Sequence, residues 1–294
     1  MTEKIRVGSR ESELAIAQAE IVMAKIKHAN PDVIFELVLI RTTGDRNLDI
    51  DLDTLGGKGV FITELEQALV EDRIDIAVHS YKDMPFDVND DLPVVALTER
   101  EAPFDVLVLP YAQTEFDNSL PVGSSSQRRS IQFNLMYPDY EVKPIRGNVL
   151  TRLAKLDLGE YSALILAQAG LIRLGCADRI SRVFTLDEMV PAGSQGIIAV
   201  QARKGDNVSY LAAVHDWQSE VASLAERSYL RALGSSCESP VGVFAQIASE
   251  EILLTAMYVA PSGEIEIGKT TGKVDQAQYL GESLANELLM RVGA

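Results

Sequence analysis

Short apolar runs alternate with amphipathic stretches along the first two thirds of the chain, and this alternation restricts the fold more than any other feature. Apolar runs predict strands, and hydrophobic residues at every third or fourth position predict helices. The pattern predicts strands at residues 5–7, 35–40, 75–78, 106–109, 120–122, around 142 and at 163–166, and helices at 12–29, 61–71, up to 136, 149–158 and up to 174. Strands that alternate with helices predict an α/β fold whose parallel sheets carry helices on both faces.

The same pattern divides the chain into domains. It starts again near Pro103, and residues 196–203 are expected to form a strand that returns to the first unit. The last part predicts the elements of a small α+β domain, namely a helix ending at 233, strands at 243–247, 252–260 and 264–269, and a final helix from about 275. We therefore expect three domains, which are residues 1–98 with 196–216, residues 103–192, and residues 218–294.

The chain is strongly acidic, with 43 Asp and Glu against 27 Lys and Arg and a net charge of -16. Such a charge repels phosphate backbones, so nucleic acid is not expected as a partner. The chain has no run of about 18 apolar residues, and residues 1–7 lack the apolar segment of a secretory signal. We expect a cytoplasmic protein that does not enter a membrane and whose cysteines, Cys176 and Cys237, are free thiols.

Against this acidic background, cations gather beside Gly, Ser and Asn where strands lead into helices. The densest example is Gly-Ser-Ser-Ser-Gln-Arg-Arg at residues 123–129, and similar turns occur at 57–59 and 145–148. Backbone N–H groups at a helix start and guanidinium forks bind anions together. A single such cation is more often a solvated surface charge, but five occupy equivalent places after strands, namely Arg10, Lys82, Arg128, Arg129 and Arg146. The sequence therefore predicts a site that encloses a small polyanionic ligand.

Asp83 lies among these cations, after the strand at 75–78. A carboxylate in that place can hold a ligand N–H, stabilise a developing positive charge or transfer protons. It can equally form an ion pair with a neighbouring arginine, and the spacing alone does not decide between these roles.

Cys237 lies in the segment Gly-Ser-Ser-Cys-Glu-Ser-Pro at 234–240, which is typical of an exposed loop after a helix. The usual alternative is a buried, inert cysteine, and Cys176 fits that description better. Cys–His catalysis is disfavoured because none of the three histidines has a motif neighbour. A thiol without a base is better suited to be an attachment point.

Motifs for several other chemistries are missing. Residues 49–53 have the alternating aspartates of a calcium loop, but Thr54 and Val60 stand where that loop needs glycine and glutamate. No Walker loop, dinucleotide fingerprint, zincin motif or Cys-x-x-Cys pair is present. We expect no metal site.

These residues together resemble the porphobilinogen deaminases, a family also called the hydroxymethylbilane synthases, over almost the whole chain. The resemblance rests on many short motifs in the same order: residues 8–12, 56–59, 78–83, 123–129, 146–153, 169–173, 195–196 and the loop around Cys237. The chain departs from the usual family pattern at Gly193–Ser194, where an aliphatic residue and a glycine are commoner. It also departs at Ser235–Ser236, where two glycines are usual, and at Thr54, where some members have a lysine.

The resemblance implies two lobes like those of type-2 periplasmic binding proteins around a cleft, and a small third domain that carries the cysteine. It implies a transferase of tetrapyrrole and haem biosynthesis, working as a monomer with porphobilinogen as its small-molecule substrate. Four porphobilinogens would be joined head to tail onto a dipyrromethane cofactor, held by Cys237 through a thioether, with loss of ammonia at each addition. Water would then release hydroxymethylbilane, which would be handed over to the next enzyme of the pathway.

The resemblance also implies roles for individual residues, because each pyrrole carries an acetate and a propionate. Asp83 would bind pyrrole N–H groups, stabilise positive charge and assist proton transfer, and Lys58 on its glycine loop would gate the cleft. Arginine suits these carboxylates because its fork can bind them bidentately. Implied cofactor contacts come from Lys82, Ser126, Arg128, Arg129 and Arg146, and implied substrate contacts from Arg10, Ser12, Lys58, Ser124, Arg152, Arg173 and Gln195.

Two other functions explain part of this pattern. A two-lobed binding or regulatory protein for an anionic ligand, without turnover, would also need the arginines. It would not need a third domain with an exposed thiol. A catalytically silent relative would keep the ligand site, but the retention of Asp83 and Cys237 disfavours it.

Overall fold

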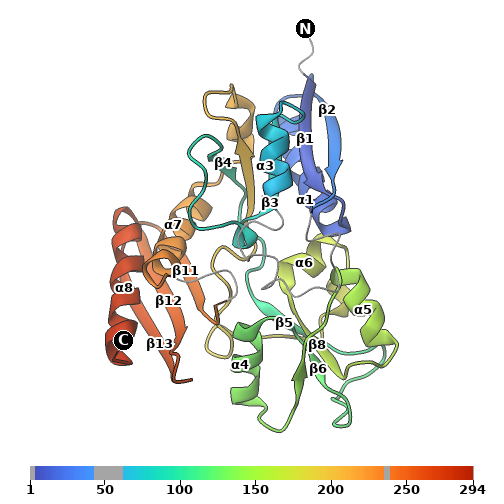
Figure 1. Cartoon of the computed structure of the whole chain (residues 1–294), viewed down its shortest axis with the longest axis vertical. Helices are drawn as coiled ribbons and strands as arrows, with labels where there is room; N and C mark the ends of the chain where they lie inside the picture. The colour runs from blue at the N-terminus through green and yellow to red at the C-terminus, as the bar shows by residue number, and fades with distance from the viewer. Residues whose placement is uncertain (1–3, 43–61, 235–238, 294) are drawn as a thin grey trace. The chain divides into compact units, whose positions relative to one another are not determined.

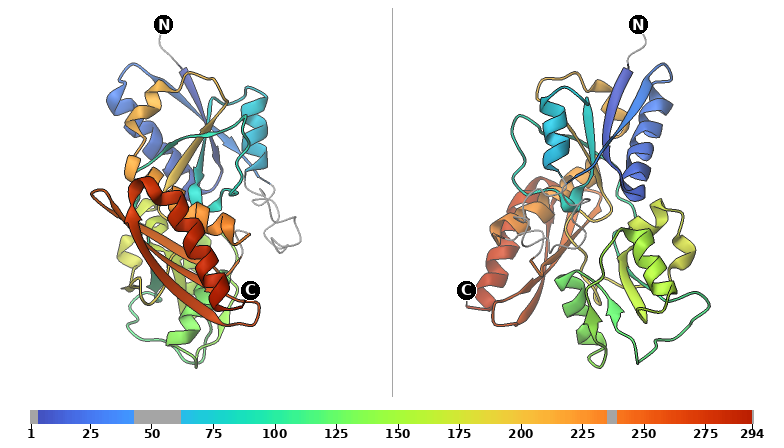
Figure 2. Two further views of the ribbon diagram at one scale, coloured as in Figure 1. Left: turned by 90° about the vertical axis from the view of Figure 1, so that its left-hand side faces the viewer. Right: turned by 45° about the vertical axis from the view of Figure 1, so that its right-hand side comes forward.

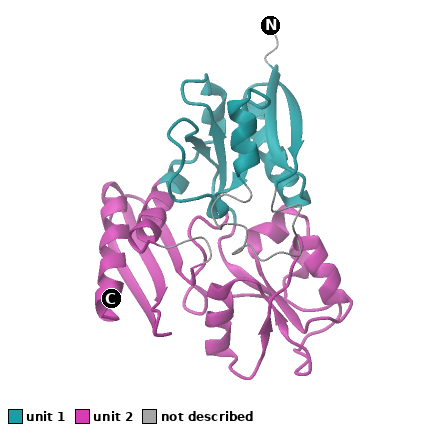
Figure 3. Ribbon diagram, in the orientation of Figure 1, with its two compact units in different colours: residues 1–101, 197–220 teal, residues 102–196, 221–294 magenta. Residues whose placement is uncertain are grey.

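The computed structural model describes residues 4–42, 62–234 and 239–293. The chain forms two compact units, one of residues Met1–Glu101 with Ile197–Glu220 and one of Ala102–Gly196 with Val221–Ala294 (Figure 3). No helix in the described part of the chain is both long enough and apolar enough to cross a membrane.

Unit 1 is built on a five-stranded sheet in the order β2-β1-β3-β10-β4 (Figure 1). Its strands are β1 (Lys4–Arg10), β2 (Ile34–Ile40), β3 (Ile76–Ser80), β4 (Val94–Leu97) and β10 (Ile198–Ala202). Helix α1 (Glu13–Ala29) packs on one face, where Val22 and Ile26 join a core with Ile76 and Val78. Helix α3 (Thr63–Val70) packs against a second core that contains Ala77, so alternate β3 residues face different helices.

Unit 2 contains a second five-stranded sheet in the order β7-β6-β8-β5-β9. Its strands are β5 (Asp105–Val108), β6 (Val122–Gly123), β7 (Val142–Lys143), β8 (Ala163–Ala167) and β9 (Arg182–Val183), and its helices are α4 (Gln127–Met136), α5 (Val149–Asp157) and α6 (Gln168–Arg173). Leu156 of α5 and Leu171 of α6 belong to one apolar core, and Phe133 of α4 belongs to another.

The two sheets repeat one strand order. In each, three parallel strands stand in the order second, first, third, and an antiparallel strand, β10 or β5, follows the third. The sequence predicted parallel sheets, and this was wrong for β10 and β5, which run antiparallel to β3 and β8. Each of these two strands follows a segment without a helix, 98–104 or 184–197, along which the chain passes from one sheet to the other.

The C-terminal part of the chain, which falls in unit 2 apart from the first residues of α7, has the small α+β architecture that the sequence predicted. It consists of α7 (Trp217–Ala232), β11 (Gly242–Ala248), β12 (Glu251–Val259), β13 (Ile265–Lys273) and α8 (Ala277–Arg291). The three strands form an antiparallel meander that α8 covers (Figure 2). Helices α7 and α8 approach closely at Gly281, where a Cβ atom would lie 2.8 Å from the backbone nitrogen of Tyr229.

Candidate active site

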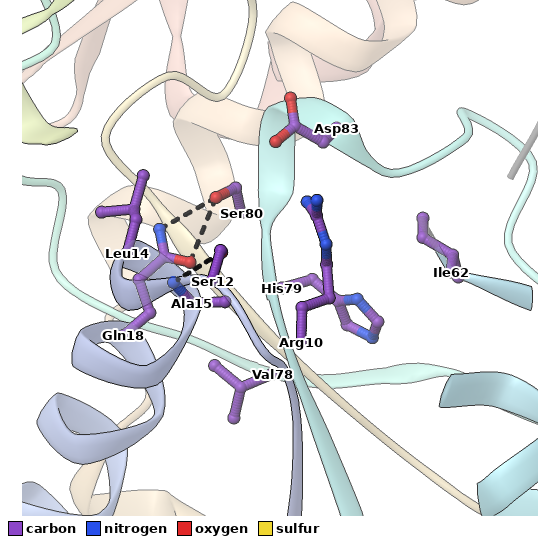
Figure 4. A pocket seen from close by; sticks show the side chains of 10 residues that line it. All are labelled: Arg10, Ser12, Leu14, Ala15, Gln18, Ile62, Val78, His79, Ser80 and Asp83. Carbon is purple, nitrogen blue, oxygen red and sulfur yellow. Dashed lines mark hydrogen bonds between the residues drawn. The ribbon is translucent and has the colours of Figure 1, made fainter. Parts of the chain in front are cut away.

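A pocket of about 70 Å³ lies in unit 1 at the carboxyl ends of β1 and β3 (Figure 4). These strands are parallel neighbours, so the segments that follow them meet at one edge of the sheet. Arg10 ends β1, and Asp83 lies in the 3-10 helix η2 (Tyr81–Asp83) directly after β3. The pocket is lined by Arg10, Ser12, Leu14, Ala15, Gln18, Ile62, Val78, His79, Ser80 and Asp83. It thus brings together three residues that the sequence singled out: Arg10, Ser12 and Asp83.

The Asp83 side chain is exposed at this pocket, and the ion pairs found in the described part of the chain do not include it. Lys82 precedes it in η2 and is half-buried. Ser12 caps α1, where its hydroxyl accepts a hydrogen bond from the backbone N–H of Ala15 at 3.4 Å. The pocket therefore presents a carboxylate, a guanidinium and a helix start to a ligand.

Two polar residues of the pocket, Gln18 and Ser80, were not predicted as site residues. Gln18 lies on α1 and its side chain is only 3% exposed. Its Nε2 donates a hydrogen bond to Ser80 Oγ at 2.8 Å, and Ser80 Oγ also lies within donating distance of Gln18 Oε1, at 3.1 Å. A glutamine on the apolar face of a predicted helix was the available signal, because a buried amide needs a polar partner.

His79 lines the same pocket from the other face of β3 and is 6% exposed. The pKa of its imidazole is lowered from 6.5 to about 4, chiefly by burial and to a smaller extent by the positive charge of Arg10, while the side chain of Gln201 opposes the shift. The imidazole is therefore neutral at neutral pH and adds no positive charge beside Arg10.

In unit 2, Arg128 and Arg129 share one buried carboxylate, that of Asp105. Arg128 Nη1 donates to Asp105 Oδ2 at 2.7 Å and to the carbonyl oxygen of Val190 at 2.7 Å. Arg129 Nε donates to Asp105 Oδ1 at 2.9 Å. Burial alone would raise the pKa of Asp105, but the charges of the two arginines hold it well below its usual range. Two cations against one anion leave this cluster with a surplus positive charge.

Gln195 belongs to the same cluster. Its Nε2 donates to the carbonyl oxygen of Pro103 at 2.7 Å and to Asp105 Oδ1 at 3.0 Å, and its Oε1 accepts from Arg129 Nη2 at 3.5 Å. Asp105 was not predicted as a site residue. A charged residue inside the apolar strand that follows Phe104 was the signal that could have identified it.

Three serines shape the turn between β6 and α4. Ser126 caps α4, and its hydroxyl accepts from the backbone N–H of Arg129 at 3.5 Å. Ser124 Oγ accepts from the backbone N–H of Ser126 at 3.2 Å. Ser125 accepts from the backbone N–H of Ile145 at 3.0 Å and donates to its carbonyl oxygen at 2.6 Å, which joins this turn to the segment after β7.

The remaining predicted arginines of unit 2 are half-buried at strand and helix ends. Arg146 follows β7, and Arg152 Nε donates to the carbonyl oxygen of Gly147 at 2.8 Å. Gly147 has a φ of 109°, which favours glycine. Arg173 ends α6 and donates to the carbonyl oxygen of Gly196.

The predicted residues therefore fall into two groups, one in each unit. Lys58 and Cys237 lie outside the described residues. Cys176 is a half-buried free thiol. Residues 4–42, 62–234 and 239–293 contain no cluster of side chains suited to hold a metal ion.

The sequence matches two family models. One is described as porphobilinogen deaminase, dipyromethane cofactor binding domain, and matches residues 5–210; the other is porphobilinogen deaminase, C-terminal domain, and matches residues 221–290. A protein named porphobilinogen deaminase from Acetivibrio thermocellus is 55% identical over 286 residues, which cover 97% of this chain and 98% of that protein. One of the same name from Alkaliphilus oremlandii is 52% identical over 285 residues, covering 97% and 96%.

Among solved structures, the effector-binding domain of BenM with benzoate aligns with 72% of this chain and 88% of its own, at 14% identity and a TM-score of 0.40. Because this TM-score is low, the fold is defined by the strand orders of the two sheets and not by the likeness to BenM.

Proposed function

The chain belongs to the porphobilinogen deaminase family, and we propose that the groups described above carry out the reaction of that family. The enzyme is a transferase of tetrapyrrole biosynthesis with a dipyrromethane cofactor. It condenses four porphobilinogens head to tail, with loss of ammonia, and releases hydroxymethylbilane. The observation that carries this conclusion is the match of both family models and of relatives that cover 97% of the chain.

The residues of unit 2 fit the dipyrromethane cofactor chemically. Each pyrrole ring carries an acetate and a propionate, and the Arg128–Asp105–Arg129 cluster has a surplus positive charge. We propose that this cluster, with Ser126 and Arg146, holds those carboxylates. Lys82, in unit 1, is proposed as a further cofactor contact on the family resemblance alone. When bound, the cofactor supplies the pyrrole carbon to which the first substrate ring is joined.

Cys237 is our proposed anchor of that cofactor, through a thioether. The attachment needs a free and accessible thiol. Cys176 is half-buried, whereas the sequence around Cys237 is typical of an exposed loop. Lys58 is proposed to gate the site from its glycine loop. Both positions lie outside the described residues, so these two roles rest on the family resemblance.

Asp83 is our proposed catalytic residue. When the aminomethyl group of porphobilinogen loses ammonia, positive charge develops on the pyrrole and its methylene carbon. The exposed carboxylate of Asp83 can accept a hydrogen bond from the pyrrole N–H and stabilise that charge. It can also take up the proton that the attacking pyrrole carbon loses when the new carbon–carbon bond forms.

Arg10 and Ser12, at the same pocket, are proposed to bind the acetate and propionate of the incoming substrate. Arg152, Arg173 and Ser124 are proposed to do the same in unit 2. Gln195 is proposed to act on substrate through the arginine cluster that its side chain joins.

We further propose that the enzyme is a cytoplasmic monomer of three domains, with the boundaries expected from the sequence. A free thiol supports a reducing compartment, and the acidic net charge disfavours nucleic acid as a partner. The released product would pass to the next enzyme of the pathway.

The test is turnover combined with intact mass. Purified protein incubated with porphobilinogen should release ammonia and hydroxymethylbilane, and its mass should include two linked pyrrole units that a Cys237→Ser variant lacks. A binding or regulatory protein would retain porphobilinogen without releasing ammonia. An unmodified wild-type chain that never acquires the adduct would contradict the proposed anchor.

A further inference from the structure

Gln18 and Ser80 form a hydrogen-bonded pair in the wall of the pocket that also contains Arg10 and Asp83. We propose that Gln18 is a positioning residue that directs the hydroxyl proton of Ser80 toward a carboxylate of the bound pyrrole. The inference rests on the proposed function for the identity of the ligand, a pyrrole that carries acetate and propionate groups.

The side chain of Gln18 is held in a fixed position by its burial and by its hydrogen bond to Ser80. It lies on α1, 62 positions before Ser80 in the chain, and its side chain is 3% exposed. Burying an amide without a partner is costly, so the contact with Ser80 is needed to compensate its burial. Figure 4 shows the amide directly beside Ser80, with Ser12 and Ala15 on the same side of β3.

The hydroxyl of Ser80 bonds to Gln18 and not to the backbone of η2. It is the residue before η2, a place where a serine hydroxyl often caps the helix, but its side chain makes no such capping hydrogen bond. The hydroxyl contacts Gln18 instead. Ser80 is half-buried at the pocket, so its remaining hydrogen-bonding capacity faces a ligand rather than the backbone of η2.

The hydrogen bonds with Gln18 determine where the hydroxyl proton of Ser80 points. A hydroxyl has one proton and can accept two hydrogen bonds. Gln18 Nε2, at 2.8 Å, donates to Ser80 Oγ, which leaves the Ser80 proton available to the pocket. Before a ligand binds, that proton can be donated to Gln18 Oε1, at 3.1 Å. A ligand carboxylate would take it over, while the donation from Nε2 continues and strengthens the O–H as a donor.

The charged residues of the pocket indicate which ligand group the Ser80 proton would meet. Arg10 makes the pocket favourable to anions, and the Asp83 carboxylate is suited to a pyrrole N–H or a positive charge. A proton directed by Gln18 would complement the carboxylate arm that Arg10 attracts. The pair would therefore favour an acceptor oxygen at that place on the ring, and a carboxylate more strongly than a carboxamide because its oxygens are charged.

The experiment is a double-mutant cycle with Gln18→Met, Ser80→Ala and the double variant. Methionine matches glutamine in length but forms no comparable hydrogen bond. Gln67→Met is the matched control, since Gln67 lies exposed on α3 and its Nε2 donates to Glu71 Oε1 at the surface. Two quantities are measured: kcat and KM with porphobilinogen, and the calorimetric Kd of a pyrrole with acetate and propionate but no aminomethyl group, which cannot lose ammonia.

We expect each single variant to raise KM and the analogue Kd about tenfold, with kcat changed less than about twofold, as for one lost hydrogen bond to a charged group. The double variant should raise KM and the analogue Kd by about tenfold as well, and not by more, because Gln18 acts through Ser80. An effect of about a hundredfold in the double variant, or an unchanged KM in a folded Gln18→Met protein, would overturn the proposal.

A second variant covers the case in which Gln18→Met does not fold. Gln18→Glu keeps the shape of the side chain but has only acceptors, so it would hold the Ser80 proton and weaken analogue binding more than tenfold. An unchanged Kd for that variant would refute the inference. If the double-mutant cycle shows coupling in analogue binding but the wild-type protein shows no turnover, the proposed function fails and the inference stands. If the wild-type protein turns over and the cycle shows no coupling, the inference fails and the proposed function stands.

Discussion

Lowering the pH from 7 to 5 should destabilise unit 1 through His79, even though this residue carries out no step of the proposed reaction. The folded protein holds the pKa of the buried imidazole at about 4, against 6.5 in the unfolded chain. The neutral form therefore favours folding. Its contribution is complete above pH 6.5 and is lost as the pH falls from 6.5 toward 4, since the unfolded state binds the proton first.

The size of the effect follows from these two pKa values. Between pH 7 and pH 5, proton binding by the unfolded state removes about 1.8 kcal/mol of unfolding free energy, and the full difference below pH 4 is about 3.4 kcal/mol. A His79→Gln variant keeps a polar side chain beside Gln201 but does not titrate. The wild-type protein should thus lose about 1.8 kcal/mol more than the variant over this interval.

The assay is urea unfolding at pH 7 and pH 5, followed by the fluorescence of Trp217. This is the only tryptophan of the chain, and it is the first residue of α7, at the end of the segment Ile197–Glu220 of unit 1 and directly before the C-terminal part of unit 2. All other titrating groups act equally in both proteins and cancel in the comparison. Equal losses of free energy in wild type and variant, or a His79 pKa near 6.5 in an NMR titration, would refute the reasoning.

Three further predictions follow from single contacts. Asp83→Asn should lower kcat at least about a hundredfold with an unchanged melting temperature, measured by ammonia release, and near-normal turnover would remove Asp83 from the mechanism. Asp105→Asn should cost at least about 3 kcal/mol in urea unfolding because it leaves two buried cations without their anion, whereas the exposed control Asp187→Asn should cost under about 1 kcal/mol; similar costs would contradict this. Gly281→Ala should cost about 1–3 kcal/mol by thermal unfolding, since the methyl would overlap the carbonyl of Ala225, and an unchanged melting temperature would show that α8 shifts freely.

Local pattern was enough to predict most elements of the fold. The helix expected at 12–29 is α1 (Glu13–Ala29), with Ser12 as its cap, and the strand expected at 163–166 is β8 (Ala163–Ala167). The short strands β4 and β9 were missed. β9 has only two residues, which is too few for alternation to be recognised.

Contacts between distant residues could not be predicted in the same way. The predicted cations do lie at strand ends, but the sequence does not reveal that Arg128 and Arg129 close on Asp105, which is 23 and 24 positions away. The contact of Gln18 with Ser80 depends on α1 packing on the face of β3 that Ser80 shares. Such pairings are set by sheet order and register, which local periodicity does not specify.

The sharing of Asp105 by Arg128 and Arg129 also determines when conformational entropy is lost. A free arginine side chain gives up about 2 kcal/mol of rotamer entropy when it becomes ordered. Here the carboxylate of Asp105 and the carbonyl oxygens of Val190 and Ile165 already hold both guanidinium groups. That loss occurs while unit 2 folds, so an anion that arrives later meets cations whose motion is already restricted.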